Sequence, residues 1–358
     1  MNKKKIIIFG ACGNVGSYFT KYALEYFNND EYEIIASGRR NTDFFTKRGI
    51  KYYSVDISCA ADFEKLPTDN VYAIVLLAAQ IPSYMEGYQP EKYINSNIVG
   101  AFNVCEYARK VKADRILYTT TVFDISLSAK DGVMLKPDTP VNFSYKGDHA
   151  LYVITKNTAI ELLKHYHAEY GIKDFIFRLP TIYSYSPYHY YHPNGVKTLR
   201  PIYRMIERAK NSEPLEIWGD SNYSTDMVHV YDFSQELCKA IEANRDGGFY
   251  NIGTGKPVTL EEKVRTIVEV FSPKDNPSKI IYCPEKKNSG GFALDITNAK
   301  EELGYEPKYG IKELLEDYKE EMKVDRFLEL IPTSITCSWS IIPKFLKLSI
   351  DCFSSGLL

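Results

Sequence analysis

Short apolar runs alternate with stretches of helical periodicity along the first half of this chain. The runs lie at residues 6–9, 32–37, 51–58, 71–79, 115–121 and 174–180, and the helical stretches at 14–27, 60–66, 91–112 and 149–170. A short run that is apolar throughout is typical of a strand in a parallel sheet that is covered on both faces. The pattern therefore predicts an α/β fold with a doubly wound parallel sheet.

The regularity weakens after residue 180. The tyrosine-rich segment 183–195 has no clean period and is expected to be a loop. It is followed by predicted helices at 201–210, 233–244, 260–271 and 311–328, a buried strand at 247–255 and a hairpin at 214–223. We therefore expect a first domain over residues 1–180, rejoined by segments near 226–255, and a smaller C-terminal α/β domain over residues 181–330.

Residues 331–358 form an apolar tail. Pro332 and Pro343 interrupt it, and Lys344 and Lys347 place charges inside it, so it is too broken to span a membrane. Three interpretations stay open for the tail: it caps the core, joins an interface, or lies on a bilayer.

Composition narrows the class of protein. The chain has 358 residues, a net charge of −2 and 25% charged residues, which does not indicate a surface for nucleic acid. Its 7 cysteines are an odd number and form no C-x-x-C pair, which favours reduced thiols and a cytoplasmic location. His189 and His192 lack the acidic or thiolate neighbours that a metal site needs, so we expect no metal.

A glycine-rich turn joins the first predicted strand to the first helix. Gly10, Gly13 and Gly16 have the spacing G-x-x-G-x-x-G within KKIIIFGACGNVG. Glycines there let the backbone approach a pyrophosphate closely, and the helix N-terminus offers unpaired N–H groups to the phosphates. Three glycines also form ordinary tight turns, but the position at the first strand–helix junction favours a Rossmann-type dinucleotide site.

The end of the second strand bears on the choice of dinucleotide. An acidic residue there binds the 2′-hydroxyl of NAD, whereas an arginine suits the 2′-phosphate of NADP. Gly38 stands near that place and Arg39 and Arg40 follow, which favours NADP unless the pair is only an exposed basic turn. Asp56 ends the third predicted strand. In that place it can contact the adenine of the cofactor or, together with Ser58, cap the next helix.

Candidate chemistry lies on the fifth strand and on the helix at 149–170. Thr119, Thr120 and Thr121 end the strand at the edge where open α/β sheets bind ligands, although threonine is also a good strand former. Tyr152 and Lys156 lie one helical turn apart. A neighbouring ammonium favours the phenolate, so the pair fits proton transfer beside a nicotinamide. Tyrosine and lysine at this spacing are also common without any role.

The order of these pieces resembles the extended short-chain dehydrogenase/reductases, the NAD(P)-dependent epimerase/dehydratase group that acts mainly on nucleotide sugars. The resemblance covers residues 4–325. Its matching segments are GACGNVG, SGRR, VDIS, LLAAQ, NIVGAFNV, ILYTTT, YVITK, RLPTIY, DMVHVYD, YNIGTG and ELGYEP. It implies a Rossmann domain, a smaller substrate domain, and a homodimer formed through the helices at 91–112 and 149–170.

The resemblance also implies roles for individual residues. Tyr152 is the implied catalytic acid or base, Lys156 its partner, and one threonine the third member. Aligning the strands selects Thr121, whereas aligning Phe123 with the aromatic residue of the family's V-Y-G selects Thr119; we favour Thr121. The implied cofactor contacts are Gly10, Gly13, Asn14, Val15, Gly16, Arg39, Asp56, Ile57, Ala78, Ala79, Tyr152, Lys156 and Pro180.

Departures from the family's motifs narrow the activity. Residues 122–124 read V-F-D in place of V-Y-G, and they lack the Asp-Glu that follows the catalytic threonine of the dehydratases, so we do not expect sugar dehydration. Thr225 stands where an arginine often grips a nucleotide diphosphate, and Arg200 or Arg204 is the expected replacement.

We therefore expect an NAD(P)-dependent reductase or epimerase of a nucleotide sugar that works through a transient 4-keto state. Arg39 favours net reduction with exchangeable NADPH. The tyrosine-rich segment suits a sugar or a base as well as it suits a packed loop. Two alternatives stay open: a reductase of a non-nucleotide carbonyl substrate, and a non-catalytic NADP-binding regulator, against which Tyr152 and Lys156 argue.

Overall fold

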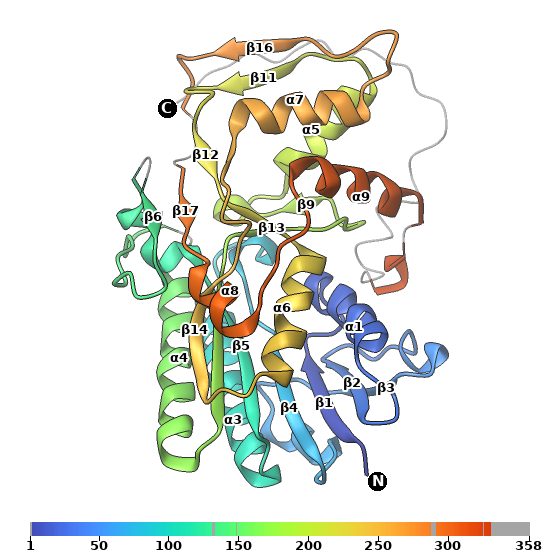
Figure 1. The fold of residues 1–358 in the computed structure, drawn as a ribbon, viewed down its shortest axis with the longest axis vertical. Coiled ribbons are helices and arrows are strands. Elements are labelled where there is room, and N and C mark those ends of the chain that lie inside the picture. The colour runs from blue at the N-terminus through green and yellow to red at the C-terminus, as the bar shows by residue number, and fades with distance from the viewer. Residues whose placement is uncertain (1, 131–132, 148, 288–290, 325, 331–358) are drawn as a thin grey trace.

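The computed structural model describes residues 2–130, 133–147, 149–287, 291–324 and 326–330 (Figure 1), so the apolar tail at 331–358 lies outside the described residues. The centre of the fold is a seven-stranded sheet in the order β14-β7-β5-β4-β1-β2-β3, in which every pairing is parallel. Its strands are β1 (Lys4–Phe9), β2 (Tyr32–Gly38), β3 (Lys51–Ser54), β4 (Val71–Leu76), β5 (Arg115–Thr121), β7 (Lys173–Leu179) and β14 (Gly247–Asn251). The predicted doubly wound α/β sheet is confirmed.

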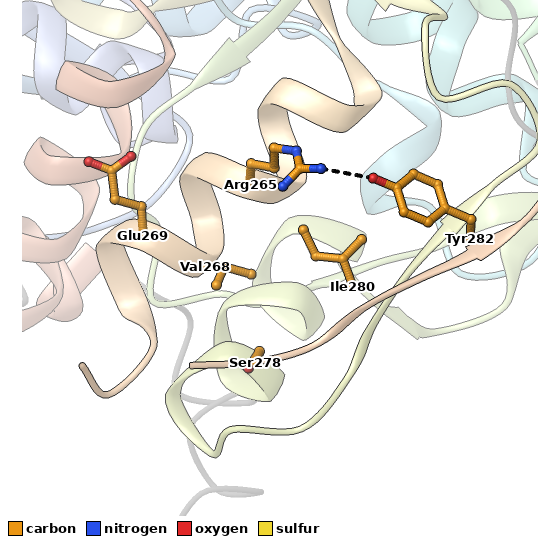
Figure 2. Close-up of a pocket in the computed structure, with 6 residues that line it drawn as sticks. All are labelled: Arg265, Val268, Glu269, Ser278, Ile280 and Tyr282. Carbon is orange, nitrogen blue, oxygen red and sulfur yellow. Dashed lines mark hydrogen bonds between the residues drawn. The ribbon is translucent and has the colours of Figure 1, made fainter. Parts of the chain in front are cut away.

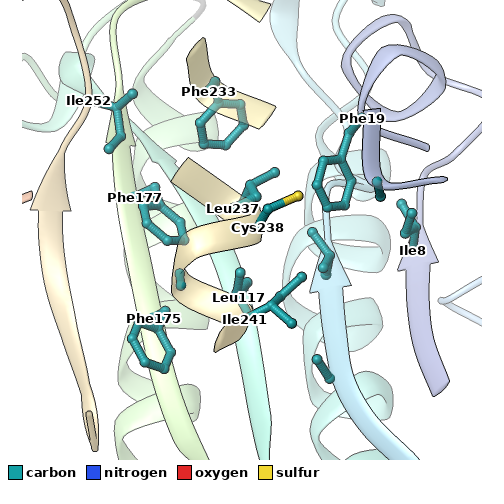
Figure 3. Close-up of a cluster of buried hydrophobic side chains, with 14 of the residues drawn as sticks. Ile8, Phe19, Leu117, Phe175, Phe177, Phe233, Leu237, Cys238, Ile241 and Ile252 are labelled. Atoms are coloured by element: carbon teal, nitrogen blue, oxygen red, sulfur yellow. The ribbon is translucent and has the colours of Figure 1, made fainter. Parts of the chain in front are cut away.

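Helices cover both faces of this sheet. The helices on one face are α1 (Asn14–Tyr26) and α6 (Val230–Glu242), and those on the other are α3 (Gly100–Val111) and α4 (Ala150–Tyr170). Figure 3 shows Phe233, Leu237 and Ile241 of α6 lying over Leu117 and Phe177 of the sheet. All five side chains are fully buried. Burying such apolar surface is the main stabilising term in a domain of this kind.

The strand order places a switch point between β1 and β4. The chain runs from β1 outward to β2 and β3, and then returns to form β4 on the other side of β1. Helices that follow two neighbouring strands therefore leave in opposite directions and open a crevice at the carboxyl ends of the strands. In sheets of this class that crevice binds the ligand.

A smaller lobe lies beyond the carboxyl ends of the strands (Figure 1). Its helices are α5 (Pro201–Lys210), α7 (Leu260–Phe271) and α9 (Ile311–Val324), which bury a separate apolar core around Ile206, Ile217 and Leu315. Its short strand pairs are β11 (Leu215–Trp218) with β16 (Ile280–Cys283), β12 (Ser224–Thr225) with β15 (Val258–Thr259), and β9 (Tyr190–Tyr191) with β10 (Thr198–Leu199).

Three further pieces connect the two parts of the chain. β8 (Thr181–Tyr183) pairs in parallel with β13 (Met227–His229), and β6 (Met134–Leu135) pairs in parallel with β17 (Ala293–Leu294), which precedes α8 (Thr297–Leu303). No helix in the described ranges is both long enough and apolar enough to cross a bilayer.

The predicted helix at 91–112 is wrong as a single element. It consists of α2 (Pro90–Tyr93), the π-helical turn η4 (Ile94–Val99) and α3. The side chain of Asn97 explains the widened turn, because it is buried and forms hydrogen bonds with the backbone of Gln80 and the hydroxyl of Thr155. π-turns of this kind are often found at functional sites.

Other predicted elements also differ from the structure. The hairpin at 214–223 is wrong, because β11 pairs in parallel with β16, which lies far along the chain. The stretch at 60–66 is the 3₁₀ helix η2 (Ala60–Lys65), and the loop at 183–195 contains β9. Local periodicity does not identify a strand's partner, which explains the wrong hairpin.

Candidate active site

The glycine-rich turn has the shape expected of a phosphate cradle. Gly10 has a φ of +92°, and a Cβ there would lie 2.6 Å from the backbone nitrogen of Ala78, next to β4. A Cβ at Gly16 would collide with the carbonyl oxygen of Gly10. Gly13 is the N-cap of α1 and provides no side chain to cap the first N–H groups. These groups therefore remain available to an anion at the switch point.

The two arginines after β2 differ in burial. Arg39 is exposed, whereas Arg40 is half-buried and its guanidinium lies within electrostatic reach of the Cys12 thiol and the Tyr52 hydroxyl. Burial lowers the pKa of Arg40. Its Nη1 is buried and has no hydrogen-bond partner among the described residues. A buried cationic donor of this kind is costly unless an acceptor pairs with it.

Asp56 serves the turn that follows β3. Its Oδ1 accepts hydrogen bonds from the backbone nitrogen of Ser58 at 3.0 Å and from the Ser58 hydroxyl at 2.7 Å. The N-cap residue of η2 is Cys59, so the alternative prediction that Asp56 caps this helix is wrong. Ile57 is buried against Gly100, and its carbonyl accepts a hydrogen bond from Asn103.

The segment after β4 is anchored to α4. Ala78 and Ala79 are half-buried, and Asn97 accepts a hydrogen bond from Gln80 N at 2.8 Å and donates to Gln80 O at 3.0 Å. The same amide donates to Thr155 Oγ1 at 3.0 Å, one residue before Lys156. Sequence reasoning assigned no role to Asn97. A polar residue at a buried position of a helix was the available signal.

Thr121, Tyr152 and Lys156 lie together at the carboxyl edge of the sheet. The side chains of Thr121 and Tyr152 form a hydrogen bond. Lys156 is 1% exposed, with its Nζ 4.1 Å from the ring centre of Tyr118. Burial lowers the pKa of Lys156 to about 7. Burial also raises the pKa of the Tyr152 hydroxyl, and the hydrogen bond from Thr121 opposes that effect.

A buried ion pair that sequence reasoning missed lies beside this group. Asp124 follows Thr121 by three residues and pairs with Arg178 at 3.0 Å. Pro180, two residues beyond Arg178, is buried between β7 and β8. The Asp at position 124, where the family's motif has glycine, was the only signal in the sequence. Its partner lies more than fifty residues away in the chain, so the signal could not identify it.

The tyrosine-rich segment packs against the loop after β4. Arg200 donates from Nη2 to Tyr84 Oη at 3.1 Å and from Nε to the Tyr190 carbonyl at 3.2 Å, while Arg204 is exposed. His189 stacks on Tyr203 with ring centres 3.5 Å apart. Asn14 donates to the Ser184 hydroxyl at 2.6 Å, which ties the glycine-rich turn to this segment.

Two hollows are large enough for small molecules. One of about 490 Å³ lies near Tyr93, between the loop after β4, the start of α4 and the tip of the β9–β10 hairpin. The other, of about 440 Å³, lies between α7 and β16 in the smaller lobe (Figure 2). Arg265 in the second hollow already donates to Tyr282 and pairs with Glu261. No predicted catalytic or cofactor residue is among the lining residues of either hollow. Within the described ranges, no three His, Cys, Asp or Glu side chains gather as metal ligands do.

Comparison with known proteins identifies the relatives of the chain. The model of the NAD dependent epimerase/dehydratase family matches residues 6–253, which is more than half of the chain. UDP-glucuronic acid decarboxylase 3 from Arabidopsis thaliana is 26% identical over 90% of this chain and 91% of its own length.

Solved structures agree with this match. UDP-glucose 4-epimerase from Thermotoga maritima, with UDP-glucose, has a TM-score of 0.71 at 23% identity and covers 89% of this chain and 99% of its own. A mutant UDP-glucuronic acid 4-epimerase from Bacillus cereus, in complex with a UDP-sugar analogue and NAD, has a TM-score of 0.69 at 20% identity over 89% of this chain and 99% of its own.

Proposed function

We propose that this protein, which belongs to the NAD dependent epimerase/dehydratase family, transfers a hydride between a nicotinamide cofactor and a carbinol or keto carbon of a nucleotide sugar. As a member, it is an enzyme of the extended short-chain dehydrogenase/reductase type. The observation that carries the proposal is the placement of Thr121, Tyr152 and Lys156 at the carboxyl edge of the sheet, the edge at which the glycine-rich turn also begins.

Tyr152 is the proposed acid–base. The bound cofactor supplies the hydride acceptor or donor. In the oxidising direction Tyr152 takes the proton of the sugar hydroxyl while the hydride leaves the carbon that bears it. In the reducing direction Tyr152 returns that proton to the carbonyl oxygen. Lys156 in its ammonium form favours the phenolate, and the hydrogen bond to Tyr152 supports Thr121 rather than Thr119 as the third member.

NADP is the proposed preferred cofactor, with Arg40 rather than Arg39 as the partner of the 2′-phosphate. The glycine-rich turn leaves no room for side chains where a pyrophosphate would approach. The Arg40 guanidinium lies within electrostatic reach of Cys12 in that turn, its Nη1 has no partner in the described residues, and a phosphate is an anion that would satisfy it. The Bacillus cereus structure was solved with NAD, so titration calorimetry with NADPH and NADH is the direct test.

A nucleoside diphosphate is the proposed non-reacting portion of the substrate, and Arg200 its diphosphate partner. The hydrogen-bond acceptors of Arg200 in the described residues are a tyrosine hydroxyl and a carbonyl, which leave its charge uncompensated. Arg200→Gln is expected to weaken UDP binding about tenfold, the loss of one charge-assisted hydrogen bond. Arg204→Gln, on the same helix but exposed, is the matched control and is expected to bind UDP as the wild type does.

The reaction itself is tested with UDP-glucose, UDP-galactose and UDP-glucuronate. Each sugar is mixed with the oxidised cofactor, the absorbance of reduced nicotinamide is followed, and the products are separated by chromatography. Transient reduction of the nicotinamide together with an inverted sugar supports an epimerase. Oxidation of NADPH by a UDP-4-keto sugar, offered in a separate reaction, supports a reductase. The absence of binding and of turnover with all three sugars would contradict the nucleotide-sugar proposal and favour a non-nucleotide carbonyl substrate.

Assembly, domain use and location are also proposals. Ile94 and Phe102 beside η4 and α3, and Ile154 on α4, are exposed apolar side chains that suit a homodimer formed through these helices. We assign cofactor binding to residues 1–180 with 226–255 and substrate binding to 181–330. The cysteines of the described residues are free, which suits the cytoplasm.

A further inference from the structure

The ion pair of Asp124 and Arg178 is almost completely buried. Asp124 is 1% exposed and Arg178 2%. Arg178 donates from Nε to Asp124 Oδ1 at 3.0 Å and from Nη2 to Oδ2 at 3.1 Å, so the contact has two prongs. A buried pair of this kind is retained at a desolvation cost that a hydrophobic pair would not have. A buried pair kept at such a cost therefore calls for an explanation other than its contribution to stability.

Arg178 lies directly beneath the end of β5. In the sheet it is the register partner of Thr120 on one side and of Asn251 on the other, and Leu179 is the partner of Thr121. Its Nη1 donates to the Pro137 carbonyl at 3.0 Å and to Asn251 Oδ1 at 3.2 Å. The guanidinium therefore joins three neighbouring strand ends to the connection that follows β5.

The same pair holds the connection between β5 and α4. The Asp124 carbonyl accepts a hydrogen bond from Asn142 N at 2.7 Å, and Asn251 Nδ2 donates to the Leu135 carbonyl at 2.8 Å. This connection begins after Thr121 and leads to α4, which carries Tyr152. The buried pair thus anchors the connection just after Thr121, on the Thr121 side of the Thr121–Tyr152 contact.

We propose that Asp124 and Arg178 are a positioning pair, which holds Thr121 at hydrogen-bond distance from Tyr152. The inference rests on the proposed catalytic role of Tyr152. It concerns this chain in particular, because the family's motif has glycine where Asp124 stands. The pair touches neither Tyr152 nor a reacting atom in its recorded contacts, so its effect is exerted through Thr121.

Asp124 also acts on Tyr152 through its charge. Burial is the largest cause of the raised Tyr152 pKa; the charges of Tyr93 and Asp124 raise it further, and the Thr121 hydrogen bond lowers it. Replacing the carboxylate by an amide removes one raising contribution and, if Thr121 moves, also the lowering one. The pH titration of Tyr152 therefore responds to the pair in a way that simple loss of stability does not.

The test compares Asp124→Asn with Asp114→Asn. Asp114 pairs with Arg115 at the opposite end of β5, so the control breaks an ion pair of the same strand away from Tyr152. Crystal structures of both variants report the Thr121–Tyr152 contact. NMR of isotope-labelled tyrosine, assigned with Tyr152→Phe, reports the titration of Tyr152. Rates of cofactor reduction by a UDP-sugar that the wild type turns over, with the KM, report the consequence for the reaction.

The expected result is specific to position 124. Asp124→Asn loses the Thr121–Tyr152 hydrogen bond, raises the pKa of Tyr152 because that hydrogen bond contributes more than the Asp124 charge, and lowers kcat about 10–100-fold with little change in KM. Asp114→Asn changes none of these. Arg178→Lys, which keeps the charge but not the two-pronged contact, is expected to act in the same direction, and Asp124→Glu to restore part of the rate.

Two results would overturn the inference. One is a structure of Asp124→Asn or Arg178→Lys in which the Thr121–Tyr152 contact is intact and the Tyr152 titration is that of the wild type. The other is an equal loss in Asp114→Asn, which would show a general effect of stability. If no sugar is turned over but the contact and titration change as expected, the positioning pair stands and the proposed substrate fails.

Discussion

The two ends of strand β5 differ in how they handle charge. At the amino end, Asp114 accepts from Arg115 at 2.7 Å and from Lys173 at 3.1 Å, and its carboxylate is 34% exposed. These hydrogen bonds outweigh burial and lower the pKa of Asp114. At the carboxyl end, Asp124 is 1% exposed, and burial raises its pKa despite Arg178. The same type of pair is therefore solvated at one end and enclosed at the other.

The difference shows that strained and poorly solvated groups gather at the carboxyl edge of the sheet. The carboxyl edge contains a lysine with a pKa lowered to about 7, a buried arginine donor that has no partner among the residues the structure describes, and a glycine turn with positive φ. The amino edge has ordinary surface pairs such as Lys5 with Asp69. Strained or poorly solvated groups collect at functional sites because the surrounding structure holds them there.

Loss of the Tyr152 hydroxyl, at the carboxyl edge, is expected to have the largest of the effects, a loss of reaction rate. Tyr152→Phe should lower the rate of cofactor reduction by a UDP-sugar about 10²–10⁴-fold, because the acid–base group is gone. Tyr166→Phe, on the same helix toward the amino edge, removes a hydrogen bond to Glu106 and should leave the rate near that of the wild type. Stopped-flow absorbance measures both. Comparable rates for the two variants would remove Tyr152 from the mechanism.

Breaking the ion pair at each end of β5 should lower the free energy of unfolding by different amounts. Asp124→Ala leaves Arg178 buried with an unpaired charge and is expected to lower the free energy of unfolding by about 3–5 kcal/mol. Asp114→Ala should lower it by less than about 1 kcal/mol, because Arg115 keeps its bonds to the carbonyls of Ala240 and Ala243. Urea denaturation gives both values, and similar losses would contradict the contrast.

Glu236 on α6 sharpens the comparison, because it is a buried carboxyl without a cation partner. Neither oxygen has a hydrogen-bond partner in the described part of the chain, and burial raises its pKa to about 8, with Lys239 opposing. Its folded pKa exceeds the ordinary value of 4.5. The unfolded chain therefore loses its proton first, and stability falls as the pH rises from about 4.5 to about 8.

Glu236→Gln should remove that part of the pH dependence, which is on the order of a few kcal/mol. The measurement is the free energy of unfolding at the two ends of this pH window, with Glu242→Gln, exposed on the same helix, as the control. A wild-type stability that changes with pH no more than that of Glu236→Gln would show that Glu236 is not the responsible group.

Substitutions of the two arginines after β2 should give the smallest of these effects, a change in the preference between NADPH and NADH. Arg40→Ala is expected to reduce the preference for NADPH over NADH about tenfold, because the guanidinium within electrostatic reach of Cys12 in the glycine-rich turn is lost. Arg39→Ala, which removes an exposed side chain, should keep the preference. Calorimetry on both variants decides between them. A preference lost only in Arg39→Ala would restore the assignment made from the sequence.

The sequence by itself was sufficient for the central sheet and for the turn and helix that carry the candidate site residues. Continuous apolar runs predicted the buried strands, because a parallel sheet covered on both faces has no polar side to show in the sequence. The glycine spacing predicted the turn, and the spacing of Tyr152 and Lys156 placed both on one helix face, since these features depend on residues close together in the chain.

Tertiary structure decided what depends on distant partners. It left Arg39 exposed and Arg40 half-buried, joined Thr121 to Tyr152, paired β11 with β16, and joined Asp124 to Arg178. The side chains of adjacent residues point in different directions, although the local sequence pattern is the same for both. The sequence alone therefore does not show which of two adjacent residues points toward a given partner; the pairing of the strands decides it. The physical reason is that burial, and with it each pKa and each missing partner, is a property of the packed whole.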